Sequence, residues 1–500
     1  MKNHNDFHFR LVSSRRGSAL LIAYFMILVL LGIGASFAVL SASESKTAER
    51  QRLTAVAFHL AEAGIERGLS DLRQDFISGG TINSWVDGNI HGYVIGPDTV
   101  NFYAIPYTDT SLNGGTYNVA LKNVSGSSGD IWVRSTGTIG GVSQTITVYT
   151  KMYSVSPWNY AIFAGRGAAG AMVNGNVDIR GSVLILGSGL NPGDLAIDLG
   201  GTAEFVGNNY RTLAAALRAK VPALPTTVIG GETVETLNAK LHVKRGIIGL
   251  SGSSTVGEIN IAGNAYKETA DGVFTNDGFG GNQGAASVHS DNGTTNAYDL
   301  GEAVRFPSLS DPYMGYSSYQ EYLKNNALVL TNQLNNVTST SVFSYSNANG
   351  SISMDGAGNL TISGIVYVDG GNSVNLVDKG KTINYTGKGS ILSTGNVQVD
   401  VNLLTAGNNS FPNNNIGFMT PNNITLGTTA QMDAMGLFYA ENQITCSKQT
   451  DILGTFVSNY FNMGTNVPAI YQVPEVINHL PPGMIGGNTY WYTIVGWIKS

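Results

Sequence analysis

The first 76 residues combine a long uncharged apolar stretch with an amphipathic continuation. No charged residue occurs over residues 18–43, and at about 1.5 Å of rise per residue a helix of that length exceeds the roughly 30 Å hydrocarbon core of a bilayer. Residues 44–76 contain no proline, and apolar residues four, three and four apart share one helical face: Ile65, Leu69, Leu72 and Phe76. The pattern predicts one continuous helix over residues 18–76, roughly 85–90 Å long.

The residues before the apolar stretch indicate how it lies in a membrane. Lys2, Arg10, Arg15 and Arg16 precede it, opposed by Asp6, and such a basic bias places the N-terminus in the cytoplasm. The stretch is too long for a cleavable secretory signal, whose apolar region spans about 7–15 residues. We therefore expect a single membrane pass with the rest of the chain outside. A plain anchor and an assembly handle both fit this expectation.

Short strands separated by turns follow the predicted helix. Residues 77–156 read as an antiparallel meander. In the glycine- and asparagine-rich residues 157–500, short apolar strands recur between Gly364 and Gly464 at spacings of roughly 18–26 residues, typical of β-solenoid coils. A β-sandwich or jelly roll is the alternative. The fold class is therefore α+β, in this order: basic leader 1–17, helix 18–76, β head 77–156, and large all-β domain 157–500 with helical inserts near 208–225 and 311–336.

Composition agrees with an exported, β-rich protein. Charged residues make up 12% of the 500 residues, and 63 residues are glycine. The formal net charge is −6, and beyond the leader no Lys/Arg stripe offers a surface for nucleic acid. The single cysteine, Cys446, cannot form an internal disulfide. We expect it to be a small buried strand residue.

The search for catalytic chemistry gives a weak signal. G-x-S-x-G and H-E-x-x-H motifs do not occur in the sequence, so we expect no enzymatic activity, no metal and no cofactor. Calcium ligands in a Gly/Asn/Asp-rich loop are a minor alternative, without EF-hand spacing: Asp271, Asp277 and Asp291. Acids for polysaccharide cleavage exist, mostly at predicted turns: Asp355, Asp369, Asp378 and Asp400. One insert carries tyrosines that suit either internal packing or a binding patch: Tyr313, Tyr316, Tyr319 and Tyr322.

Two segments resemble a known family. RRGSALLIAYFMILVLL, beginning at Arg15, resembles the class III signal of type IV pilins. In that family a dedicated peptidase cuts after the glycine that ends the leader, and the new N-terminus is methylated. The matching positions are Gly17 and Ser18. AFHLAEAGIERGL, over residues 57–69, resembles the helix signature of PilX-type minor pilins, whose central residues here are Ala61, Glu62, Ala63, Gly64 and Ile65.

One departure from the family narrows the interpretation. Major pilins carry Glu at the fifth mature position, which is Ile22 in this chain. In the family that Glu pairs with the N-terminal ammonium of a neighbouring subunit, and a buried charge without its partner costs several kcal/mol. The departure favours a subunit at a filament terminus over a repeating shaft subunit.

The resemblance implies a minor pilin-like subunit that acts in type IV pilus assembly, as an initiating or tip subunit, and in surface display or adhesion. Its partners would be other pilins and minor pilins, through the N-terminal helix, together with the prepilin peptidase and the inner membrane. A surface or a glycan would be the ligand of the outer domain. We expect the protein to lie in the inner membrane before assembly and in the periplasm, at the cell surface or in the pilus afterwards. A subunit of a type II secretion pseudopilus would carry the same signal.

The alternative is a membrane-tethered β-solenoid protein that binds or cleaves polysaccharide. A tethered protein of that kind needs no processing junction between Gly17 and Ser18. The leader therefore separates the two hypotheses.

Overall fold

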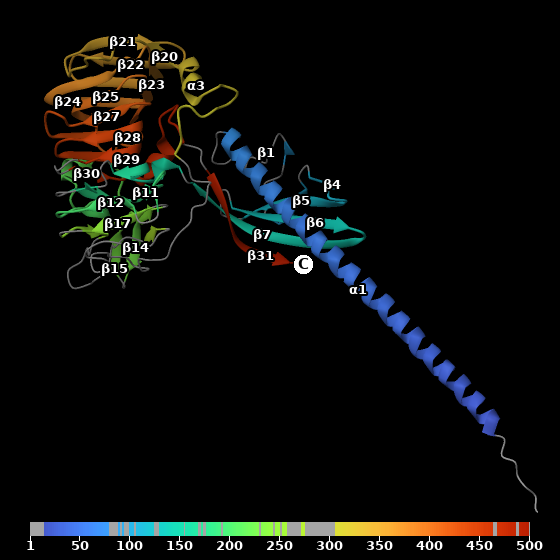
Figure 1. The fold of residues 1–500 in the computed structure, drawn as a ribbon. Helices are drawn as coiled ribbons and strands as arrows, with labels where there is room; N and C mark the ends of the chain where they lie inside the picture. The colour runs from blue at the N-terminus through green and yellow to red at the C-terminus, as the bar shows by residue number, and fades with distance from the viewer. Residues whose placement is uncertain are drawn as a thin grey trace, which may run out of the picture. The chain divides into compact units, whose positions relative to one another are not determined.

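The computed structural model in Figure 1 describes residues 15–79, 89–90, 93–94, 100–104, 107–124, 130–154, 156–168, 172–173, 177–191, 194–229, 232–243, 246–250, 253–257, 272–275, 306–463, 468–486 and 490–499. The chain divides into two compact units. The head unit comprises Met1–Met152 and Tyr492–Ser500, and the column unit comprises Tyr153–Trp491.

One helix begins the head unit. It is α1 (Arg15–Gly79), 65 residues long, which confirms the continuous helix expected from the sequence. Among the described residues, α1 is the one helix that is long and apolar enough to cross a membrane, and its most apolar 18-residue window is not buried at all. A fully exposed apolar helix segment is stable in lipid or against other apolar helices, because its own chain covers none of it.

An antiparallel sheet forms the rest of the head unit, as predicted. Its strands are β3 (Tyr103–Ala104), β4 (Thr110–Leu112), β5 (Gly115–Asn123), β6 (Ile131–Ile139), β7 (Val142–Ser154) and β31 (Tyr490–Lys499). β5, β6 and β7 pair in succession, and β3 and β4 both pair with β5. Buried and half-buried residues alternate along β5, so that one face of the sheet packs against α1. A separate pair, β1 (Asn89–Ile90) with β2 (Tyr93–Val94), is also antiparallel.

The last strand belongs to the head sheet. β31 lies beside β7 at the edge of that sheet, and residues 492–500 cluster with the head unit. The prediction placed these residues in a C-terminal domain that runs to residue 500, and the structure differs at this point. The column unit is therefore an insertion between two strands of the head sheet.

Parallel ladders build the column unit. The strands of its C-terminal half are β20 (Leu328–Leu330), β21 (Val342–Ser346), β22 (Gly350–Asp355), β23 (Asn359–Val368), β24 (Val374–Ser393), β25 (Val397–Thr405), β26 (Asn415–Thr420), β27 (Asn423–Leu426), β28 (Met432–Cys446), β29 (Thr450–Asn462) and β30 (Ala469–Tyr471). Over residues 359–462, three ladders of parallel pairs run across successive strands. A jelly roll uses antiparallel strands and does not account for this pairing.

The repeat seen in the sequence corresponds to rungs of these ladders. Gly364 pairs with Gly389, and Gly436 pairs with Gly454. Gly454 has a φ of 147°, and a Cβ there would collide with the backbone of Gly436 in the next rung. Glycine recurs at this point because the chain turns a corner against its neighbour.

We name the ladders A, B and C. Ladder A runs through Asn375, Gln398, Thr425 and Thr445. Ladder B contains the pair Asp433–Asp451 and continues to β30. Ladder C contains the successive pairs among Ile391, Phe418, Phe438 and Phe456.

Apolar side chains of all three ladders form one core. In ladder A the inward positions are fully buried: Val374, Val397, Ile424, Ile444 and Phe461. In ladder C, Phe418 and Phe438 stack with ring centroids 5.7 Å apart. Cys446 is fully buried in ladder A, as predicted, and burial raises the pKa of its thiol to about 12.

The first strand of the column unit, β8 (Ile162–Ala168), lies inside the stack of strands and not at one of its ends. The N-terminal strands are β8 (Ile162–Ala168), β9 (Met172–Val173), β10 (Asp178–Arg180), β11 (Val183–Ile185), β12 (Leu195–Leu199), β13 (Glu204–Gly207), β14 (Thr226–Ile229), β15 (Glu232–Glu235), β16 (Lys240–Val243), β17 (Ile247–Leu250), β18 (Thr255–Val256) and β19 (Gly272–Thr275). β8 pairs in parallel with both β29 and β11, so the two halves of the column join there, as the adjacent red and green strands of Figure 1 show. At the far end β21 and β22 continue from β23 as antiparallel strands.

The segments that enter and leave the column are hydrogen-bonded to each other. The Ser156 hydroxyl donates to the Gly486 carbonyl at 2.9 Å, and the Trp158 indole donates to the Ile485 carbonyl at 2.7 Å. We call these four residues the clasp. Short 3-10 turns accompany it at Pro157–Asn159 and Pro474–His479. The clasp holds the two ends of the inserted unit together, which suits its attachment to neighbouring strands.

The helical inserts are shorter than expected. α2 covers Ala215–Arg218 within the predicted 208–225, and α3 covers Tyr319–Asn325 within the predicted 311–336. Ser318 caps α3 by accepting a hydrogen bond from the Glu321 backbone N–H.

Candidate functional site

The first candidate site is the N-terminal part of α1. Gly17 and Ser18 lie in the first turn of the helix, but their surroundings are outside the described part of the chain, so the processing junction stays a prediction. Ile22 is 60% exposed and belongs to a continuous run of exposed apolar residues. A carboxylate at that position would have to leave water on membrane insertion, whereas isoleucine has no such cost.

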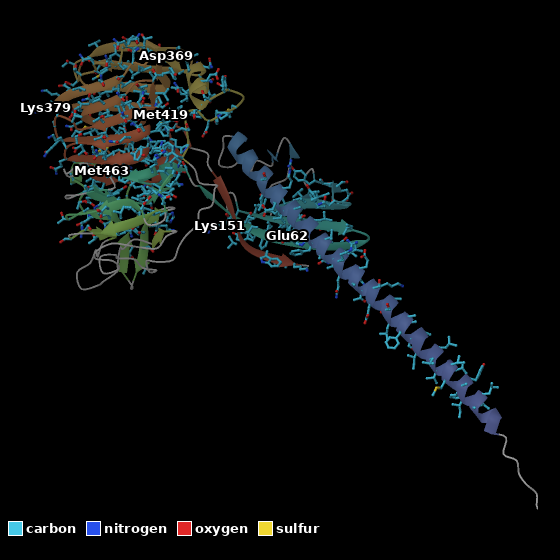
Figure 2. The ribbon with its side chains drawn as sticks, viewed as in Figure 1. Glu62, Lys151, Asp369, Lys379, Met419 and Met463 are labelled. Atoms are coloured by element: carbon cyan, nitrogen blue, oxygen red, sulfur yellow. The ribbon has the colours of Figure 1, made fainter. Side chains whose placement is uncertain are left out.

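The helix signature lies where α1 meets the sheet. Ala61 is 0% exposed and Ile65 is 3% exposed, while Glu62 points away from the sheet. Glu62, labelled in Figure 2, contacts His59 one turn earlier at 2.8 Å between Oε2 and Nδ1. The two faces of the signature therefore have different tasks: one packs against the sheet and the other is presented to solvent.

Small residues allow the helix and sheet backbones to approach closely. A Cβ on Gly64 would collide with the Ser135 hydroxyl, and a Cβ on Gly137 of β6 would collide with the Ala57 carbonyl. The same added atom on Gly137 would lie 2.6 Å from the Ala61 nitrogen. The buried Ala61, Gly64 and Ile65 and the half-buried Ala63 therefore serve to pack the helix against the head sheet.

Sequence reasoning missed the second surface of the head, which β31 provides. Ile494, Val495, Trp497 and Ile498 are exposed on this edge strand. Trp497 makes an edge-to-face contact with Phe58 of α1, with ring centroids 6.4 Å apart. A shallow groove of about 360 Å³ lies beside this contact, lined by Gln51, Thr54, Ala55, Phe58, His59 and Lys499. The aromatic and β-branched residues of β31 are typical of a strand but do not say which sheet it joins.

The predicted acids are held by different hydrogen-bond and ion-pair partners. Asp355 accepts hydrogen bonds from the Asn359 side-chain amide at 2.7 Å and from the backbone N–H groups of Ala357 and Asn359. Asp378 accepts from the Ser339 hydroxyl at 2.6 Å and from its backbone N–H. These hydrogen bonds hold the pKa values of both carboxyls below their usual range. Asp369, labelled in Figure 2, pairs with Lys324 at 2.6 Å, which likewise lowers its pKa.

Asp400 is a buried acid with a structural role. It is 1% exposed and accepts a hydrogen bond from the Thr428 hydroxyl at 2.6 Å. Together with the other three, it anchors a turn of the column through its own partners. The structure does not assemble these four acids into one site.

Two acids that sequence reasoning missed are direct neighbours. Asp433 and Asp451 pair across β28 and β29 on ladder B. Burial raises the pKa of both, and the charges of Asp433 and Asp178 add to the effect at Asp451, whose pKa rises to about 6. A signal was present in the sequence: each acid precedes a corner glycine, Gly436 or Gly454, by three residues.

The tyrosines of the insert pack against one another. Tyr313 lies 4.7 Å from Tyr319 and 4.8 Å from Tyr322 between ring centroids, and Tyr319 is 8% exposed. This mutual packing favours a structural role for the insert over a binding patch.

The three acids of the calcium alternative, Asp271, Asp277 and Asp291, lie outside the described residues. In the described ranges no group of His, Cys, Asp and Glu is arranged to hold a metal ion.

The outward side of ladder A carries uncharged polar residues in two rows. The first row is Asn375, Gln398, Thr425, Thr445 and Asn462. The second row is Ser373, Asn396, Asn423, Gln443 and Tyr460. We call these ten residues the polar grid. With rungs about 4.8 Å apart, the grid extends roughly 19 Å along the column.

Ladder C differs because other parts of the chain cover its outward side. The Tyr439 hydroxyl donates to the Pro307 carbonyl at 2.6 Å, and Asn415 donates to the His479 carbonyl at 3.2 Å. Ser390 donates to the Pro482 carbonyl, and Met484 packs against Gly417. Segments 306–323 and 474–485 therefore lie over this ladder, whereas grid residues are half-buried or exposed.

Comparisons with known proteins give limited support. No family model matches the sequence, and the comparison with curated proteins gave no match. Among solved structures, the chain is similar to the competence-associated pilin ComZ from Thermus thermophilus, with a TM-score of 0.49 and 18% sequence identity. The match covers 90% of this chain and 97% of that chain. A likeness at this level carries no argument about function, which rests on the residues described above.

Proposed function

We propose that this chain is a minor pilin-like subunit that anchors in the inner membrane through α1 and carries a large display unit. In this role it would act in assembly of a type IV pilus, at initiation or at the tip, and present the column unit to the surroundings. Its partners would be other pilins, which would contact α1, and the prepilin peptidase, which would cut between Gly17 and Ser18.

The observation that carries the proposal is the division of α1 into two parts. Its first part is apolar and exposed, and its second part packs Ala57, Ala61 and Ile65 onto an antiparallel sheet. A membrane anchor alone needs the first part only. One rigid helix that spans the membrane and forms the core of the head suits a subunit that leaves the bilayer and packs beside similar helices. Ile22 supports a terminal position, for the electrostatic reason given above.

The column unit supports the display role. We infer that the column unit is a β-solenoid whose successive coils each contribute strands to the ladders, because one coil cannot bury its own core and each ladder continues across several coils. The unit is inserted between β7 and β31, and its two ends meet at the clasp. An inserted unit of this kind leaves the head sheet complete.

We also propose a binding role without catalysis for the column unit. The four acids expected from sequence are used in turns and ion pairs, and the lowered pKa values of Asp355, Asp369 and Asp378 suit permanently ionised structural groups. The second candidate, a tethered protein that cleaves polysaccharide, has one observation in its favour: the Asp433–Asp451 pair with raised pKa values. Reducing-end release from a polysaccharide, abolished by Asp451→Asn, would favour that candidate.

An internal deletion tests the display role. We would replace residues 156–489 with a Gly-Ser linker of about 15 residues, whose root-mean-square reach is roughly 20 Å. This variant keeps β31, so we expect membrane insertion, processing and piliation to persist while attachment to surfaces or other cells falls. A chain truncated after Ser154 is the matched control, because it also loses β31 and should impair the head. Normal attachment by piliated cells that carry the internal deletion would refute the display role.

A further inference from the structure

The polar grid presents two regular rows of polar side chains on the outward side of ladder A. Its side chains are hydroxyls and amides, with one phenol, and it contains no charged residue. Each rung of ladder A adds two such positions, about two residues apart along the strand, which corresponds to roughly 6.6 Å. The result is an array of paired donors and acceptors.

The grid stands apart from the other outward surfaces of the column. Ladder C is covered by the chain itself, and ladder B presents Asp433 and Asp451. Inward of the grid, Val397, Ile424 and Ile444 are completely buried, so the strands beneath are held firmly in place. The array is therefore built on a fully buried part of the core.

Hydrogen bonds within the grid and to its neighbours Asn442 and Thr428 hold several grid side chains in one orientation. Gln443 donates to the Thr445 hydroxyl at 2.8 Å, and Asn442 donates to the Asn423 side chain at 2.8 Å. Gln398 donates to the Thr428 hydroxyl at 3.0 Å. Side chains held in place in this way lose less conformational entropy when a ligand binds.

The chemistry of the grid indicates the class of partner. An anionic polymer would require Lys or Arg, and an apolar surface would require exposed large hydrophobic residues; the grid offers neither. A partner without charge and rich in hydroxyl groups matches an array in which each group both donates and accepts. Tyr460 adds an aromatic ring at the end of the second row, where the Arg166 side chain donates to its hydroxyl at 3.0 Å.

We propose that the polar grid binds a neutral polysaccharide chain that lies along the column and contacts successive rungs. The inference deepens the display role proposed above and rests on it for its biological meaning. The grid would supply hydrogen bonds to several consecutive sugar units, so that many weak contacts add up to a useful affinity.

The test uses the full-length chain in detergent micelles. Its neutral probes are microcrystalline cellulose, chitin and a soluble β-glucan, and its anionic probes are polygalacturonate and heparin. We expect retention on at least one neutral probe and none on the anionic probes. Absence of binding to every neutral probe, or a preference for the anionic ones, overturns the proposal.

A matched pair of variants locates the site. Thr425→Lys with Thr445→Lys places two charges in the centre of the grid, and we expect at least a tenfold loss of affinity. Thr361→Lys with Thr386→Lys is the control, because these exposed threonines face each other at 3.3 Å on another part of the column. Equal affinity of the two double variants would overturn the assignment to the grid.

A second variant keeps the test decisive if the lysines disturb folding. Thr425→Val with Thr445→Val removes both hydroxyls and retains β-branched side chains that suit a strand. We expect a severalfold loss of affinity from this variant and full retention with Thr425→Ser and Thr445→Ser. Processing and filament incorporation are measured on the unaltered protein as well. If that protein enters filaments normally but binds no neutral probe, the grid alone is refuted; if it binds but does not enter filaments, the pilus role alone is refuted.

Discussion

Replacement of Gly137 by alanine should separate α1 from the head sheet. The added Cβ would lie 2.6 Å from the Ala61 nitrogen and 2.7 Å from the Leu60 Cβ, and it would also collide with the Ala57 carbonyl. Two of these atoms belong to the backbone of a helix, so no side chain can rotate out of the way. Overpacking of this kind typically costs 1–3 kcal/mol, and backbone clashes put Gly137→Ala near about 3 kcal/mol.

Hydrogen exchange of the β6 amides measures this cost in the full-length protein. A loss of about 3 kcal/mol should accelerate exchange by roughly 100-fold. Gly64→Ala should have a smaller effect, because the atom in its way is the Ser135 hydroxyl, which can rotate. Gly496→Ala is the control, since nothing lies within 4 Å of its added Cβ. If Gly137→Ala exchanged like Gly496→Ala, the packing argument for the helix signature would be wrong.

Two further changes test the column unit. The raised pKa of Asp451, about 6, means that the folded state holds a proton that the unfolded state releases, so stability should fall as pH rises from about 4 to 6. Asp451→Asn should therefore raise the free energy of unfolding by roughly 1 kcal/mol at pH 7.5, after allowance for solvent screening, and leave it unchanged at pH 4. Thermal melts at the two pH values measure this difference. A gain at pH 4 alone would contradict the argument. Trp158→Phe removes the donor to the Ile485 carbonyl and should cost about 1–3 kcal/mol, measured by urea unfolding, whereas no loss would show that the clasp is not needed.

The sequence predicts the local features of this fold well. The continuous α1 follows from uninterrupted helical periodicity, and the ladders follow from corner glycines such as Gly436 and Gly454, at which the chain turns against its neighbour. Burial of Cys446 follows from its place in an alternating strand. Each of these depends on a short stretch of chain.

Long-range arrangement could not be predicted in the same way. The pairing of β8 with β29 joins residues almost 300 positions apart, and repeats of similar composition do not specify their order in a stack. β31 looks like any strand rich in aromatic and β-branched residues, and its return to the head sheet depends on contacts with β7 and Phe58 that no local pattern contains. The polar grid was visible only as scattered Asn and Thr until the register aligned its rows.

The N-terminus of the mature protein tests the central claim most directly. Intact-mass analysis and N-terminal sequencing of the protein purified from cell membranes would identify the first residue and any added methyl group. The pilin account predicts a chain that begins at Ser18 with a methylated amine. A mature protein that begins at Met1, or at any residue after Ala42, would contradict it.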